Sequence, residues 1–104
     1  MKKVTAVLSV KFNSALSQEK LMQVCTKDLD EFCKVPGLID KYYLLEESTG
    51  AISGFYLFET KSARGSFWTS ELAALIPERY AVIPETLRVE EYNMALVLSD
   101  VVTA

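Results

Sequence analysis

The first hydrophobic segment of the chain places an apolar residue at every second position. These positions are Val4, Ala6, Leu8, Val10 and Phe12, and most of the residues between them are polar. The alternation predicts a β-strand from Lys3 to Phe12 with one apolar face and one mixed face. The opening lysines and the short apolar run resemble a secretory signal, but Lys11 interrupts the run and no small-residue cleavage site follows.

The spacing of apolar residues then changes to steps of three and four. Ser17 is a good N-cap, and Gln18 and Glu19 follow in the first turn. The apolar stripe comprises Leu21, Val24, Cys25, Leu29, Phe32 and Cys33. We expect an amphipathic helix of about five turns that ends before Pro36 and Gly37.

The second half of the chain predicts a hairpin, a helix and a last strand. Two strands, Leu38 to Glu46 and Ala51 to Glu59, flank a turn at Gly50. Thr60 or Ser62 caps a second helix that runs to about Leu75, and the segment "PERYAVIP" is an irregular connection. The inward stripe of that helix is expected to be Gly65, Trp68, Leu72 and Ile76. A fourth strand runs from Thr86 to about Asn93, and the apolar tail extends it or crosses to a partner.

The order β-α-β-β-α-β predicts an α+β, ferredoxin-like fold, a four-stranded antiparallel sheet with two helices on one face. Residues 1–104 form a single domain. The third strand carries apolar residues on both faces, with Tyr56 and Phe58 on one and Phe55 and Leu57 on the other. We therefore expect a homodimer in which the helix-free faces of two sheets stack against each other.

Composition and charge narrow the possible partners. The formal charge is −3 and the isoelectric point is about 4.9, which argues against binding to nucleic acid or to an anionic membrane. No run of 18 apolar residues is present that would span a membrane. Cys25 and Cys33 are too far apart along one helix to form a disulfide, which favours a cytoplasmic location. They occupy core-type positions without a histidine to activate them, and no metal site is expected.

RNA-recognition domains use the same order of elements, with an aromatic signature on the third strand. In "SGFYLFET", Gly54 and Phe55 fit that signature. Ser53, Tyr56 and Leu57 replace its basic, small and stacking residues. Together with the acidic isoelectric point, these departures argue against RNA binding.

Aromatic residues gather on the hairpin and the second helix. Core packing is the common reason for such a set, but a buried Tyr or Trp also needs a polar partner, which a cleft between sheet and helices would supply. Gly65 would leave room there. Asp40 and Lys41 point to opposite faces of their strand, and the pattern leaves open which of them faces inward. Arg64 and Arg79 are expected on solvated faces.

The segment "VPGLIDKYYLLEESTGAISGFYLFETKSA" resembles the YdhR-type mono-oxygenase family of the dimeric α/β-barrel superfamily. The matching residues are Pro36, Gly37, Lys41, Glu46, Glu47, Gly54, Tyr56, Leu57, Phe58, Lys61, Ser62 and Ala63, with a looser match at "RVEEYN". The chain departs from the family at Asp40, Tyr42 and Tyr43, where tryptophans tend to occur. The haem-degrading relatives need an axial histidine, which this chain lacks.

The resemblance implies cofactor-free oxidation of a small aromatic, phenolic or quinol substrate by dioxygen, in a pocket between helices and sheet. The candidate catalytic residues are Lys41, which would stabilise a phenolate, and Tyr56, which would hydrogen-bond to it. The candidate substrate-binding residues are Asn13, Tyr42, Gly65 and Trp68, the last by stacking on the ring. Alternatives are a non-enzymatic module for ligand binding or assembly, and an isomerase or lyase on the same scaffold.

Overall fold

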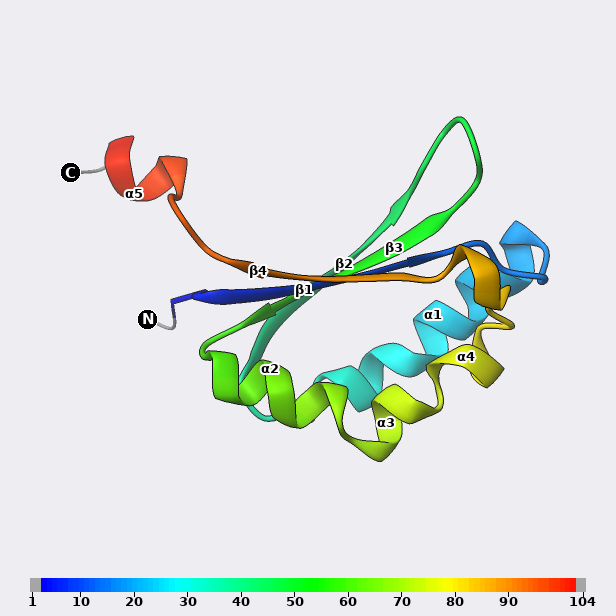
Figure 1. Ribbon diagram of the computed structural model, residues 1–104, viewed down its shortest axis with the longest axis horizontal. Coiled ribbons are helices and arrows are strands. Elements are labelled where there is room, and N and C mark those ends of the chain that lie inside the picture. Colours follow the sequence, from blue (N-terminus) through cyan, green and yellow to red (C-terminus); the bar gives the residue numbers. More distant parts are fainter. Residues whose placement is uncertain (1–2, 103–104) are drawn as a thin grey trace.

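The computed structural model describes residues 3–102 and shows a four-stranded sheet with helices packed on one of its faces (Figure 1). The elements are β1 (Ala6–Phe12), α1 (Gln18–Phe32), β2 (Leu38–Leu45), β3 (Ile52–Phe58), α2 (Lys61–Trp68), α3 (Glu71–Ala74), α4 (Ile76–Arg79), a 3₁₀ turn (Pro84–Thr86), β4 (Arg88–Asn93) and α5 (Leu98–Val102). The strand order is β2-β3-β1-β4 and every pairing is antiparallel. The predicted ferredoxin-like fold is confirmed.

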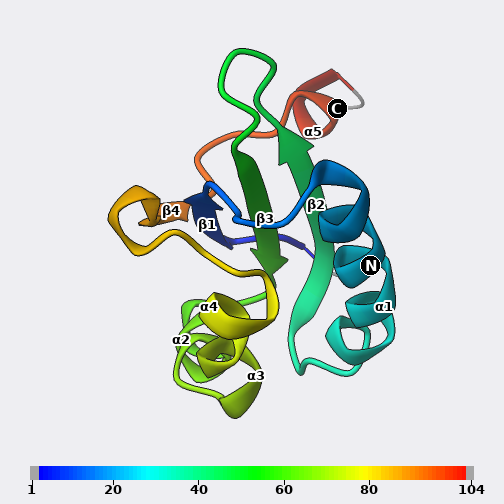
Figure 2. The same ribbon diagram turned by 90° about the vertical axis from the view of Figure 1, so that its right-hand side faces the viewer.

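The helices α1 to α4 cover the same face of the sheet (Figure 2). Residues directly opposite each other on neighbouring strands point to the same face of the sheet. Val10 of β1 lies between Gly54 of β3 and Val89 of β4, so these three residues belong to the helix-covered face. Along β3 this face is buried at Ile52, Gly54, Tyr56 and Phe58, whereas the alternate residues are half-buried. The core thus lies between the sheet and the helices.

Local signals explain how α1 begins and how the chain leaves it. The side chain of Ser17 accepts a hydrogen bond from the backbone N–H of Lys20 at 3.2 Å, as the N-cap prediction requires. After α1 the chain passes Gly37, whose φ is +77°. A Cβ at Gly37 would lie 2.5 Å from that of Ala63, so the turn into β2 needs glycine both for its conformation and for its close approach to α2.

The second predicted helix is wrong in its length and in the first half of its inward face, whereas Ile76 is buried and Leu72 packs against the core as expected. The predicted helix divides into α2, α3 and α4, because Ser70 caps a new helix through the N–H of Ala73. Phe67 is 3% exposed, whereas Trp68 is 37% exposed and Gly65 lies on the outer surface. Consecutive helical residues point about 100° apart, and Phe67, which has no polar atom, takes the buried position.

Two further expectations about side-chain environment are wrong. Arg64 is buried, where its guanidinium donates a hydrogen bond to the carbonyl of Tyr92 at 2.9 Å and pairs with Glu91 at 3.1 Å. Cys33 is exposed because it caps the solvent-facing end of α1, while Cys25 is buried as expected. Both cysteines are free thiols.

The helix-free side of the sheet, hereafter the open face, carries apolar side chains at its centre. Its three cross-strand rows are Asp40-Leu57-Val7-Tyr92, Tyr42-Phe55-Ser9-Glu90 and Leu44-Ser53-Lys11-Arg88. Tyr42 and Leu44 are 52% and 51% exposed. After β4 the chain runs past the end of the sheet into the short helix α5, which the sequence pattern does not predict (Figure 1).

Candidate functional site

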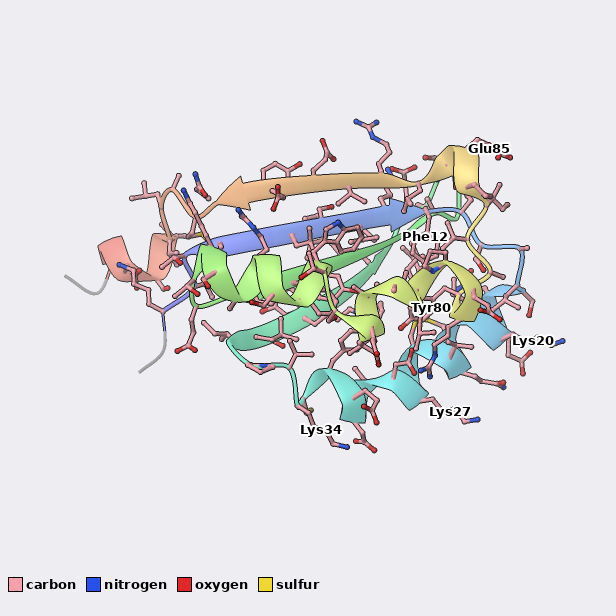
Figure 3. All side chains as sticks on the ribbon, turned by 60° about the horizontal axis from the view of Figure 1, so that its bottom comes forward. Phe12, Lys20, Lys27, Lys34, Tyr80 and Glu85 are labelled. Atoms are coloured by element: carbon pink, nitrogen blue, oxygen red, sulfur yellow. The ribbon has the colours of Figure 1, made fainter. Side chains whose placement is uncertain are left out.

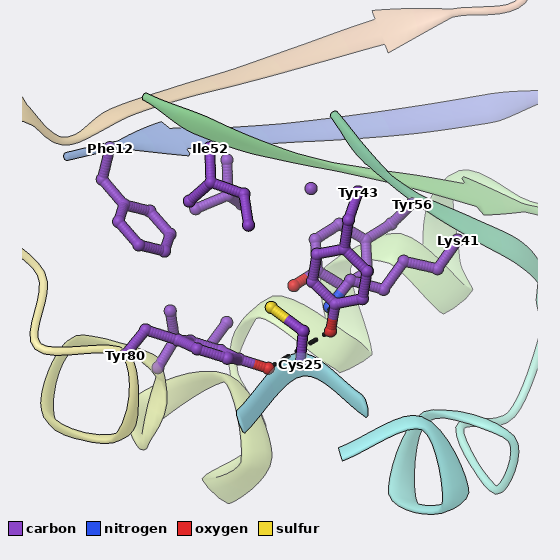
Figure 4. A pocket seen from close by; sticks show the side chains of 10 residues that line it. Phe12, Cys25, Lys41, Tyr43, Ile52, Tyr56 and Tyr80 are labelled. Atoms are coloured by element: carbon purple, nitrogen blue, oxygen red, sulfur yellow. Dashed lines mark hydrogen bonds between the residues drawn. The ribbon is translucent and has the colours of Figure 1, made fainter. Parts of the chain in front are cut away.

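A small, partly open space lies between the helix-covered face of the sheet and helices α1 and α4. It is lined by Val10, Phe12, Cys25, Lys41, Tyr43, Ile52, Gly54, Tyr56, Ile76 and Tyr80. Figure 4 shows the side chains of Lys41, Tyr43 and Tyr56 converging from the sheet, with Cys25 and Tyr80 facing them from the helices. The cavity measures about 10 Å³, which is room for about one water molecule.

Lys41 is the charged side chain that points into this space. Asp40 is exposed on the open face, so the structure resolves which of the two neighbours faces inward. The Lys41 Nζ lies 3.4 Å from the ring centre of Phe32, 4.1 Å from that of Tyr43 and 4.2 Å from that of Tyr56. Gly54 makes this arrangement possible, because a Cβ there would lie 3.4 Å from the Lys41 stem and 3.2 Å from the Tyr56 ring.

A line of hydrogen bonds leads from Lys41 to a buried carboxylate. Its Nζ donates to the hydroxyl of Tyr43 at 2.7 Å, which lies 3.2 Å from the hydroxyl of Tyr80. Tyr80 donates to Oδ2 of Asp28 at 2.8 Å, and Oδ1 of Asp28 pairs with Arg79. The donor directions are mutually consistent, so a proton can be handed along four side chains that come from β2, α1 and the end of α4.

Burial controls the protonation of this cluster. Asp28 is 1% exposed and already has Arg79 as its counter-ion, and Lys41 has no carboxylate partner among the described residues. The aromatic faces favour its ammonium form by about 2 kcal/mol or more, but desolvation opposes the charged form and is worth several pKa units for a fully buried lysine. Burial prevails and lowers the pKa of Lys41 to about 7.

Burial acts on the neutral acids of the site in the opposite sense. It raises the pKa of Tyr43, Tyr56 and Tyr80 well above their usual value, and it raises the pKa of the Cys25 thiol. The Tyr56 hydroxyl has no hydrogen-bond partner among the described residues although the side chain is 2% exposed. At neutral pH the site therefore offers protonated phenols beside an amine that is partly uncharged.

The structure brings together two of the six predicted site residues. Lys41 and Tyr56 line the cavity. Tyr42 lies on the open face, on the other side of the sheet. Asn13 lies outside the cavity, and its side chain donates to the carbonyl of Thr49 at 3.3 Å. Gly65 and Trp68, as described above, face outward from α2.

Sequence reasoning missed Asp28, Tyr43 and Tyr80 as members of the cluster. Tyr43 follows from strand alternation once Lys41 is known to face inward, because the two residues are separated by one position. Asp28 stands among charged residues of α1, and Tyr80 lies in a segment with an irregular pattern. Neither position carries a local signal that would reveal their hydrogen bond.

A second, more open space borders the same lysine. This groove lies between the end of α1 and the start of β2 and is lined by Leu29, Phe32, Cys33, Leu38, Ile39, Asp40 and Lys41. Its volume is about 260 Å³. Lys41 thus lines both the groove and the small cavity.

Within residues 3–102, no three His, Cys, Asp or Glu side chains are grouped so that they could hold a metal ion. Over the same part of the chain, no helix has the length and apolar character needed to cross a membrane.

The fold and the site can be set beside known proteins. No protein-family model and no curated protein sequence matches the chain. A protein of unknown function from Nitrosomonas europaea has a similar structure, with a TM-score of 0.73, 14% identity and coverage of 93% of this chain and 95% of that one. The ActVA-Orf6 mono-oxygenase of Streptomyces coelicolor, in complex with nanaomycin D, has a TM-score of 0.71 and 20% identity, and the match covers 91% of each chain. SnoaB, a cofactor-independent oxygenase from Streptomyces nogalater, has a TM-score of 0.62 and 11% identity, and the match covers 91% of this chain and 95% of that one.

Proposed function

We propose that this protein is a cofactor-independent mono-oxygenase that acts on a small phenolic or quinol substrate. The observation that carries the proposal is the Lys41 amine, which is held among aromatic rings beside the hydroxyls of Tyr43 and Tyr56. The fold shared with two proteins described as a mono-oxygenase and a cofactor-independent oxygenase supports it. So does the hairpin, which resembles the YdhR-type family.

The chemistry needs a base and a stabilised anion. An uncharged Lys41 amine can take the proton of a substrate hydroxyl, and the resulting ammonium then stabilises the phenolate. The electron-rich ring reacts with dioxygen at a carbon that bears hydrogen. One oxygen atom stays on that carbon and the other leaves as water with two hydrogens from the substrate, so that a phenol becomes a quinone. The Tyr56 hydroxyl is placed to donate a hydrogen bond to the bound oxygen anion.

A panel of phenols, hydroquinones and polycyclic phenols tests this proposal. The purified protein should form an oxygenated product in air, form none under nitrogen, and retain its activity after treatment with a chelator. Lys41→Ala should lower kcat, because it removes a charge that develops in the transition state. Lys27→Ala, at an exposed position of α1, should leave kcat unchanged. Equal product under nitrogen and air would refute the proposal.

The same proposal includes a homodimer joined through the open face. Phe55 and Leu57 are half-buried and Tyr42 and Leu44 are exposed there, which is more apolar surface than a sheet face normally presents to water. A specific interface should bury on the order of 1,600 Å² in total. Light scattering at micromolar concentration should give twice 11.7 kDa, and Leu57→Arg should shift the protein to the monomer. A wild-type monomer at that concentration would refute the dimer.

One observation favours a second candidate, a non-enzymatic module for ligand binding or assembly. The small cavity has room for about one water molecule and not for a ring unless side chains move. In the substrate panel, tight binding without any oxygen-dependent product would support this candidate over the mono-oxygenase.

A further inference from the structure

Lys41 is half-buried at the border of the core, and its amine lies against the rings of Phe32, Tyr43 and Tyr56. Lysine is seldom buried without a partner, and here Arg79 already neutralises Asp28, the carboxylate at the far end of the hydrogen-bonded line. We propose that Lys41 is a nucleophile that captures small, neutral aldehydes or ketones as an imine. This activity goes beyond the proposed oxygenation, because it needs neither dioxygen nor a phenolic substrate.

Access and selectivity follow from the groove. Lys41 lines the groove between α1 and β2, whose volume of about 260 Å³ accommodates a small carbonyl compound. Most of the lining is apolar, and its one carboxylate side chain is that of Asp40, which accepts a hydrogen bond from the Lys41 backbone N–H at 2.8 Å. No arginine lines the groove to bind a carboxylate. The lining therefore suits neutral carbonyl compounds and disfavours keto acids.

The neighbouring hydroxyls supply the proton transfers that imine formation requires. The nitrogen lone pair of Lys41 attacks the carbonyl carbon, a C–N bond forms, and the carbonyl oxygen takes up a proton to become a hydroxyl. The C–O bond then breaks and the oxygen leaves as water with a second proton, while the nitrogen gives up both of its protons over the two stages. The sum is amine plus aldehyde giving imine plus water, with no change of oxidation state. Tyr43, 2.7 Å from Nζ, can exchange these protons with Tyr80 and Asp28.

The environment also frees the lone pair at neutral pH. Desolvation is a known way to activate a lysine for imine formation. With its pKa lowered to about 7, about half of Lys41 is uncharged at pH 7, whereas an ordinary lysine is uncharged in fewer than about one molecule in a thousand. Lys41 should therefore react before the other lysines of the chain.

Reductive trapping tests this inference on the wild-type protein. The protein is incubated at pH 7 with propionaldehyde and cyanoborohydride in oxygen-free buffer, and modified lysines are located by peptide mapping. The internal controls are Lys20 and Lys27 of α1 and Lys34 just beyond its end, whose exposed side chains project outward (Figure 3). Lys41 should be modified at least tenfold faster than each of them. At pH 10 this preference should shrink several-fold, because about a quarter of the exposed amines are then also uncharged.

Variants and a second carbonyl reagent distinguish activated imine formation at Lys41 from mere solvent exposure of its amine. Lys41→Arg should abolish the fast-reacting site while circular dichroism stays unchanged. Tyr43→Phe should slow trapping at Lys41 several-fold, and Tyr92→Phe, at an exposed hydroxyl on the open face, should not. Pyruvate should react more slowly at Lys41 than propionaldehyde does. Modification of Lys41 no faster than that of the three exposed control lysines at pH 7 would overturn the inference, and the oxygenase proposal would stand or fall separately on its oxygen dependence.

Discussion

Replacing Lys41 with methionine should remove a pH dependence from the free energy of unfolding. Methionine has a similar length and suits the aromatic surroundings of the side chain, so the change deletes the ionisable group while filling most of its space. The surrounding rings of Phe32, Tyr43 and Tyr56 keep an apolar partner. The variant therefore isolates the cost of burying an amine.

The sign and size follow from the two pKa values of the lysine. In the unfolded chain Lys41 should hold its proton up to about pH 10.4, whereas in the folded protein its pKa is about 7. Between these two pH values the unfolded chain binds more protons than the folded protein. The free energy of unfolding of the wild type should therefore rise with pH above 7. The slope is at most about 1.4 kcal/mol per pH unit, or about 2.7 kcal/mol from pH 7 to pH 9. Escape of the flexible side chain into the groove would reduce this rise to roughly half.

The pH range of the experiment must end near pH 9, because above that value other groups lower the free energy of unfolding as the pH rises. Burial raises the pKa of Cys25 and of the three tyrosines in the cluster. Above the unfolded pKa of each group, the unfolded chain loses a proton that the folded protein keeps, and stability then falls with rising pH. Cys25 reaches this point first, near pH 9.

Urea unfolding followed by circular dichroism at pH 7, 8 and 9 gives the required free energies. The wild type and Lys27→Met, a control at an exposed lysine of α1, should both gain stability across the series. Lys41→Met should show a flat profile over the same range. Parallel profiles for Lys41→Met and the wild type would mean that Lys41 keeps an ordinary pKa, which would remove the basis for its role as base or nucleophile.

Two further predictions concern the framework. Gly37→Ala should destabilise the protein by more than about 2 kcal/mol, because the new Cβ would lie 2.5 Å from that of Ala63 at a positive φ. Gly50→Ala, with φ at +73° and nothing within 4 Å, should cost only about 1 kcal/mol; equal losses in urea would contradict the packing argument. A thiol reagent should label exposed Cys33 rapidly and buried Cys25 only on unfolding, and fast labelling of Cys25 in the native protein would show that α1 opens locally.

The fold was predictable because strand and helix periodicities differ and the turn residues are well placed. Alternation located β1 and β3 within a few residues, and Ser17 gave the start of α1. The end of the second helix was not predictable from apolar spacing alone. Its signal was the polar pair Thr69 and Ser70, which ends α2 and caps α3.

The site was only partly predictable because it is made by contacts between distant segments. Lys41 and Tyr56 come from the hairpin, where the pattern was strong. The bond between Tyr80 and Asp28 joins residues 52 positions apart. Trp68 was expected on the inward stripe of the second helix, but its neighbour Phe67 fills the core instead. The residue types in the sequence suggest which chemistry is possible. Which of those residues come together in one cluster depends on tertiary packing.

The position of Lys41 itself argues for a chemical role. A methionine or leucine there would pack among the same rings without the cost of desolvating an amine. The hydrogen-bonded line through Tyr43 and Tyr80 does not neutralise that amine, since Arg79 already pairs with Asp28. Groups that lower stability in this way are concentrated at sites where a shifted pKa is used. The stability that Lys41→Met recovers toward pH 7 is therefore a direct measure of what the fold gives up to hold a reactive amine at this position.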